Sequence, residues 1–130
     1  MSQKHPKIKR VVVNEPRMID RNIAVIKPKQ PFLDWLRSQP DWDLDLTLEQ
    51  LHEECTVVLT PDFPYIEDAR KYVESLYEML FEIELDSWYT DPSWWPDNRN
   101  LKTFRKWFDI EIHSMVIDFW GKPLKRESFW

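Results

Sequence analysis

The sequence predicts a small protein of the α/β (α+β) class, in which helices pack on one face of a three- to four-stranded sheet. Three segments, residues 22–28, 56–61 and 109–120, are rich in the β-branched and aromatic residues that favour strands. Between them, apolar residues recur at spacings of three and four, the period of an amphipathic helix. Strands separated by helical crossovers place the helices in one layer against the sheet.

The first predicted strand and helix lie within residues 22–40. Residues 22–28 (NIAVIKP) are apolar at nearly every position, so we expect a strand that is covered on both faces. Pro31 suits the first position of a helix, where its missing N–H costs nothing, and Pro40 ends that helix. The apolar side of this short helix consists of Phe32, Trp35 and Leu36.

A connector and a second helix precede the second strand. Residues 41–46 alternate acidic and apolar side chains, which is typical of an exposed connector or an edge strand. Thr47 and Gln50 have the spacing of a capping box and predict a helix start. Its apolar side comprises Leu48, Leu51 and Cys55. Because Cys55 is the one cysteine of the chain, we expect a buried thiol in a reducing compartment.

The longest predicted helix covers residues 64–89. Its apolar stripe contains Ile66, Ala69, Val73, Leu76, Leu80 and Ile83. Further apolar residues widen this stripe, so we expect the helix to pack on two neighbours: Tyr72, Tyr77, Phe81 and Leu85.

A short helix and the last strand complete the domain. Asn100 is placed to cap a helix at residues 101–108, with Leu101, Phe104 and Phe108 facing inward. In the last strand, residues 109–120, the apolar positions change parity near Ser114. Either both faces are covered there, or a bulge changes the facing of the strand.

The predicted order of these elements is β-α-α-β-α-α-β, which resembles part of a ferredoxin-like two-layer sandwich. We expect a single globular domain at residues 22–130, preceded by a basic N-terminal arm at residues 1–21. The arm has one β-prone run, residues 11–13, and either adds an edge strand or stays mobile. A sheet this small leaves open edges and one poorly covered face, which favours a homodimer.

The charge of the chain is divided along its length. Residues 34–97 carry a net charge of −14, whereas residues 1–21 carry +4 and residues from 98 onward carry +3. This acidic middle repels duplex nucleic acid and favours a basic protein partner. The single glycine excludes phosphate-cradling and dinucleotide-binding loops. No signal peptide and no membrane-spanning run is recognisable, so we expect a cytoplasmic protein without membrane contact.

Two groups of cationic residues are candidate ligand-binding sites. Lys27 and Lys29 leave the first strand just before a helix N-terminus, where anions often bind, although Pro31 removes one N–H donor. The alternative is that both lysines only flank a solvated loop.

The second cationic group is the basic side of the helix near residue 101, formed by Arg99, Lys102, Arg105 and Lys106. It could hold a phosphate or an acidic partner, or it could be an ordinary solvated face. A third possibility is pairing with the glutamate column of the longest helix, because Glu74, Glu78 and Glu82 repel one another at four-residue spacing.

The sequence also offers one candidate acid–base pair. His113 follows Glu111 by two residues in a strand, so both side chains lie on one face. They could act as a general base, or the carboxylate could simply bind the imidazole. Two ligands do not make a zinc site, which needs three or four, so we expect neither a metal nor a cofactor.

Four large aromatic residues lie in a segment interrupted by Pro92 and Pro96: Trp88, Tyr89, Trp94 and Trp95. Such a segment can be a hydrophobic flap over the core, a dimer or partner surface, or a stacking platform for a ligand with Arg99 beside it. We rank the three roles in that order.

The strand followed by KPKQPFLDW and an acidic helical region resembles a family of small uncharacterised bacterial proteins. The resemblance covers roughly residues 22 to 120. It implies no activity, cofactor or catalytic residue.

These observations favour a non-enzymatic cytoplasmic homodimer that acts through protein–protein contacts on its acidic and aromatic surfaces. The alternative is a protein or enzyme that binds a small or phosphate-containing ligand, with His113 and Glu111 as its acid–base pair. Its aromatic pocket would be lined by Lys27, Lys29, Trp94, Trp95 and Arg99. Single-stranded nucleic-acid binding through stacked tryptophans is a third possibility, opposed by the acidic middle segment.

Overall fold

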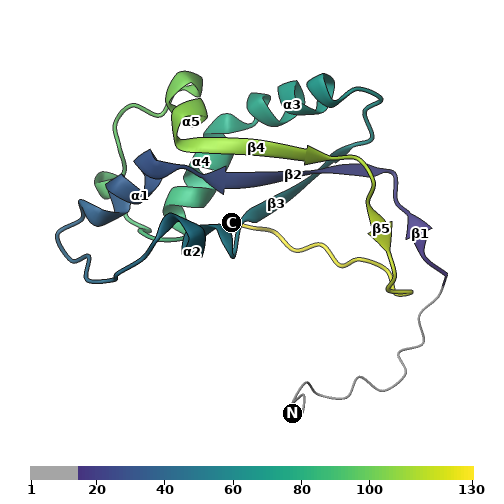
Figure 1. Cartoon of the computed structure of the whole chain (residues 1–130), viewed down its shortest axis with the longest axis horizontal. Helices are drawn as coiled ribbons and strands as arrows, with labels where there is room; N and C mark the ends of the chain where they lie inside the picture. Colours follow the sequence, from purple (N-terminus) through teal and green to yellow (C-terminus); the bar gives the residue numbers. More distant parts are fainter. Residues whose placement is uncertain (1–14) are drawn as a thin grey trace, which may run out of the picture.

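The structure is a computed structural model and describes residues 15–130. Its strands are β1 (Arg17–Met18), β2 (Arg21–Pro28), β3 (Thr56–Pro61), β4 (Phe108–His113) and β5 (Ile117–Asp118). Its helices are α1 (Gln30–Arg37), α2 (Leu48–His52), α3 (Ile66–Ser75), α4 (Tyr77–Asp86), the 3₁₀ turn η1 (Pro92–Trp94) and α5 (Leu101–Trp107). The arrangement is a small α+β fold, as the sequence predicts (Figure 1).

The main sheet has three antiparallel strands in the order β3-β2-β4. Along β2, side chains alternate between buried positions, such as Ala24 and Ile26, and half-buried positions, such as Val25 and Lys27. The buried positions belong to the core with the helices. The opposite face has no helix layer, but the segment after β5 runs back along this side (Figure 1), and its Arg126 lines a hollow with Leu59. The prediction that this strand is covered on both faces is therefore wrong: its apolar residues on the open side are shielded only in part.

The core between the sheet and the helices is built largely from aromatic rings. Phe81 of α4 lies 5.7 Å from Phe104 and 5.5 Å from both Trp107 and Phe108, measured between ring centroids. Phe32 of α1 lies 5.2 Å from Phe108. Tilted and edge-on ring pairs of this kind stabilise the fold beyond the contribution of their buried area. The aromatic richness of the chain therefore serves the helix–sheet interface first.

The longest predicted helix is two helices, and the prediction of one continuous helix is wrong. α3 and α4 meet at Leu76, whose backbone angles (φ −98°, ψ 13°) leave the helical region. The Ser75 hydroxyl bonds back to the carbonyl of Tyr72, and the Leu76 N–H bonds Val73 O at 2.9 Å in a tight turn. α3 contacts β3 and β4, and α4 contacts α5 while also reaching the sheet through Phe81 and Glu84.

The predicted helix caps are confirmed. Thr47 and Gln50 form both hydrogen bonds of a capping box, and Asn100 Oδ1 accepts from the Thr103 N–H at 2.8 Å. α2 ends at His52, however, so Cys55 lies beyond the helix, in the turn before β3. The thiol is half-buried rather than buried, because the apolar helical side ends before it is reached.

The last predicted strand is divided after His113, which explains the change of parity near Ser114. β5 leaves the main sheet and pairs with β1 in a two-stranded antiparallel ribbon, with Met18 opposite Ile117. The ribbon projects from one end of the sheet (Figure 1). The arm thus adds a strand, but to this ribbon, and its β-prone run at residues 11–13 lies outside the described residues. Within residues 15–130, no helix is long and apolar enough to cross a bilayer.

Candidate functional site

The open face of the sheet is the first candidate surface. The register aligns Leu59, Ile23 and His113 in one row across the three strands. The next row contains Val57, Val25 and Glu111. Val57 and Leu59 are 54% and 45% exposed. The face is therefore apolar toward β3 and charged toward β4.

The charged part of this face holds the predicted acid–base pair. His113 Nε2 lies 2.9 Å from Glu111 Oε2, and Lys27 Nζ lies 3.6 Å from Glu111 Oε1. The hydrogen bond to His113 and the charge of Lys27 lower the pKa of Glu111. Both side chains of the pair are about half exposed on an open surface. The geometry is that of a strand histidine bound to its neighbouring carboxylate.

The structure does not bring the two predicted anion-binding lysines together. Lys27 is directed to the open face and Glu111, whereas the Lys29 ammonium donates to the carbonyl of Arg105 at 3.1 Å. Each lysine already has an acceptor from a different part of the chain. The anion site predicted at the start of α1 is therefore not assembled.

The tryptophan segment folds back over α1. Tyr89 stacks on Trp94 at 5.3 Å and meets the Trp35 ring edge-on at 5.6 Å. The Trp35 and Trp95 indoles donate to backbone carbonyls of this segment. Tyr89 and Trp95 pack against the core, as the flap interpretation predicts, but Trp88 and Trp94 remain 39% and 38% exposed.

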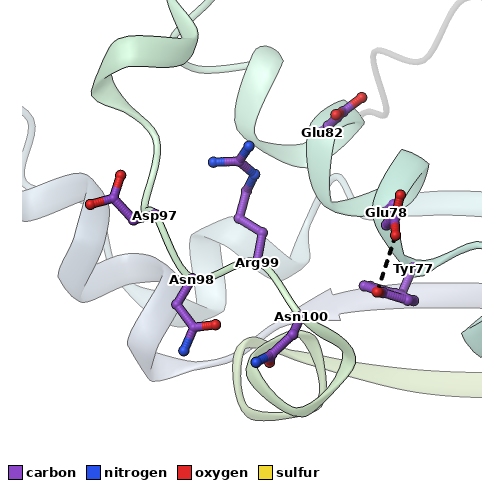
Figure 2. Close-up of a pocket in the computed structure, with 7 residues that line it drawn as sticks. All are labelled: Tyr77, Glu78, Glu82, Asp97, Asn98, Arg99 and Asn100. Atoms are coloured by element: carbon purple, nitrogen blue, oxygen red, sulfur yellow. Dashed lines mark hydrogen bonds between the residues drawn. The ribbon is translucent and has the colours of Figure 1, made fainter.

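Arg99 lies in a cavity of about 400 Å³ between α4 and the segment before α5 (Figure 2). Its guanidinium donates to the carbonyl of Pro96 at 2.6 Å and lies 5.6 Å from the centre of the Trp95 ring. Three carboxylates share the cavity: Glu78, Glu82 and Asp97. Their negative charge disfavours a phosphate here. The lysines and Arg99 of the predicted ligand pocket thus lie in separate places.

The glutamate column and the basic helix side meet at one pair. Arg105 of α5 binds Glu74 of α3 through two nitrogens, at 2.8 and 2.9 Å. This bond is the main cause that lowers the pKa of Glu74. The pair fixes the ends of two helices, so this part of the basic side is a structural contact.

A second cavity was not anticipated from the sequence. It has a volume of about 460 Å³, which lies in the range of small-molecule sites. We call it the Glu84 cleft. Its lining combines five apolar and five polar residues: Pro28, Phe32, Leu46, Leu51 and Trp88, with Gln50, Glu54, Thr56, Glu84 and Ser87.

Glu84 is the unusual member of this lining, because it is a carboxyl group that is only 7% exposed. The Thr56 hydroxyl donates to Glu84 Oε2. Burial raises the pKa of Glu84, and the bond from Thr56 opposes that rise only in part. The sequence signal was present: Glu84 falls on the apolar stripe of the helix, four residues after Leu80 and three after Phe81.

Comparison of the chain with protein-family models, with curated proteins and with solved structures finds no match in any of the three. The resemblance built on KPKQPFLDW therefore stays a prediction. Among the described residues, no group of three or more potential metal ligands is found.

Proposed function

We propose that the protein is a non-enzymatic cytoplasmic interaction protein that forms a homodimer through the open face of its sheet. The observation that carries this proposal is the apolar face without a helix layer, with Val57 and Leu59 about half exposed beside the half-buried Ile23 and Val25. Apolar residues in the middle of a sheet face usually lie under a second layer. A second copy supplies that layer.

Self-association is favoured over an unrelated partner because the face is self-complementary. A two-fold axis running across the strands, between the two rows, sets Leu59 of one copy against Val57 of the other. The same rotation sets His113 against Glu111 of the other copy. In this arrangement the apolar side chains of the two copies contact each other, and His113 and Glu111 face each other at the edge of the interface.

The acidic surface supports a further contact with a basic partner. Residues 34–97 carry a net charge of −14, and the tryptophan segment exposes Trp88 and Trp94 at one end of this region. Acidic charge steers basic segments toward the surface, and exposed indoles offer contact area when they arrive. In the proposed function the sheet face holds the two copies together and the acidic face meets other proteins.

The test of self-association is Leu59→Asp, with Leu44→Asp as its matched control. Leu44 is 55% exposed but lies in the connector before α2 and belongs to none of the strands. We expect sedimentation velocity to give a dimer for the wild type and for Leu44→Asp, and a monomer for Leu59→Asp, because a charge would be buried in the interface. A wild-type monomer at tens of micromolar, or a dimer that survives Leu59→Asp, would overturn the proposal.

A further inference from the structure

The Glu84 cleft has the layout of a site for a charged head on an apolar stem. Glu84, which is almost fully buried, lies at its inner end, and Trp88, 39% exposed, lies nearer the solvent. Phe32, Leu46 and Leu51 line the apolar space around these two residues. The Trp88 ring is itself held by Trp42, with centroids 5.8 Å apart.

The charge of the cleft is negative and unbalanced. Its lining contains the carboxyl groups of Glu84 and Glu54, and none of the described residues lining it is cationic. By contrast, Glu74 is paired with Arg105, and Glu111 contacts Lys27 and His113. Glu84 takes one hydrogen bond, from Thr56, and its other carboxyl oxygen accepts none from the described residues. A buried carboxylate is normally paired with a cation, and the lining of this cleft supplies none. The second Glu84 oxygen is not among the fully buried unpaired atoms, so it is accessible to a ligand.

We propose that the Glu84 cleft binds an organic cation on an aliphatic stem, such as an alkyl ammonium or alkyl guanidinium group. The head would bind the free Glu84 oxygen, the stem would lie along Phe32 and Leu51, and Trp88 would contribute a cation–π contact. Burial raises the pKa of Glu84, and a bound cation would offset that cost of ionisation.

This chemistry has two possible sources, a free amine or the lysine and arginine side chains of a basic protein. The second source would make the cleft the place where a basic partner inserts a lysine or arginine side chain. This version of the inference rests on the proposed contact with a basic protein. The cleft is formed on the helix side of the sheet, so its binding does not depend on self-association.

The experiment uses n-pentylammonium and n-pentylguanidinium as free cations, 1-pentanol and pentanoate as neutral and anionic controls, and a blocked hexalysine peptide as the protein-like probe. Binding is followed by calorimetry and by amide and indole shifts of Thr56, Ser87 and Trp88. Glu84→Gln keeps the acceptor for Thr56 and removes the charge. Glu82→Gln removes an equal charge from the same helix outside the cleft.

We expect both cations to bind and to shift the cleft resonances. Glu84→Gln should lower their affinity by about tenfold or more, because a charge-assisted hydrogen bond is lost. Glu82→Gln should change affinity by no more than about twofold, because this carboxylate lies in the Arg99 cavity and does not line the Glu84 cleft. Binding that Glu84→Gln weakens is the measure of the cleft. If hexalysine binds more tightly than pentylammonium by this measure, a basic protein is the source, and the reverse order identifies a free amine.

The inference is overturned if neither cation shifts the cleft resonances, or if Glu84→Gln binds them as well as the wild type does. Repeating the titration with Leu59→Asp separates the two proposals. Cation binding by a variant that sediments as a monomer would leave the cleft intact whatever the fate of the homodimer. Loss of cation binding with an intact dimer would remove the cleft alone.

Discussion

Two glutamates of neighbouring helices show how strongly position determines the state of a side chain. Glu74 of α3 is held by the Arg105 guanidinium, which lowers its pKa, whereas burial raises the pKa of Glu84 of α4. Both residues are acidic positions in one predicted helix. Their opposite behaviour follows from what lies across from each of them: a cation from α5 in one case, and Thr56 with apolar side chains in the other.

The buried carboxyl group predicts a pH-dependent gain in stability for Glu84→Gln. The folded state binds the Glu84 proton more tightly than the unfolded chain does, so stability falls as the pH rises above the ordinary value of 4.5 and through the raised pKa. We expect Glu84→Gln to be more stable than the wild type at neutral pH and to lose that advantage below pH 4.5. Urea unfolding across this pH range measures the difference. A deficit of equal size at every pH would show that the carboxyl group has a purely structural role.

Residue-level features were predictable where both partners lie close in the sequence. The contact of His113 with Glu111 follows from a two-residue spacing on one strand, and the Thr47 cap from a three-residue spacing. Lys27 and Lys29 could not be placed, because the groups they bind come from β4 and α5, more than seventy residues away. Which residues so far apart in the sequence come into contact cannot be inferred from local spacing.

At the scale of elements, strand and helix types were largely predictable and their interruptions were not. The break at Leu76 leaves the apolar stripe intact on both sides, so periodicity alone continues across it. The two helices differ in their tertiary contacts, because α4 packs on α5 as well as on the sheet, whereas α3 packs on β3 and β4. The division of the last strand was partly visible, since a ribbon strand with a different facing must change parity.

The cap of α5 gives a prediction at this scale. Asn100 Oδ1 satisfies the Thr103 N–H, and α5 carries Phe104, a fully buried residue of the core. We expect Asn100→Ala to lower the free energy of unfolding by about 1 kcal/mol, because that N–H loses its partner. Asn100→Ser, which keeps an acceptor, should recover most of the loss. The midpoint of urea unfolding measures both variants, and an unchanged midpoint for Asn100→Ala would mean that packing alone fixes the helix start.

The two faces of the main sheet differ in how well they are packed. Aromatic rings from α1, α4, α5 and β4 fill one side of the sheet, while the other side leaves Val57 and Leu59 open. Three strands cannot be covered on both faces by a helical layer that lies on one of them. The general architecture, helices on one face of a small sheet, could therefore be predicted from the sequence. Which side chains lie on the face without helices depended on the register, which could not be read from the sequence.

The same architecture predicts a gradient of local stability. β2 pairs with β3 on one side and β4 on the other, whereas β1 and β5 share only two residue pairs outside the main sheet. We expect β2 amides to exchange with solvent only through global unfolding and β5 amides to exchange roughly a hundredfold faster through local opening. Native-state hydrogen exchange followed by NMR measures both, with Leu59→Asp as the control that removes any protection from the second copy. Equal protection of β5 and β2 in that variant would mean that the ribbon unfolds together with the sheet, and the domain would then extend to both β1 and β5 as one cooperative unit.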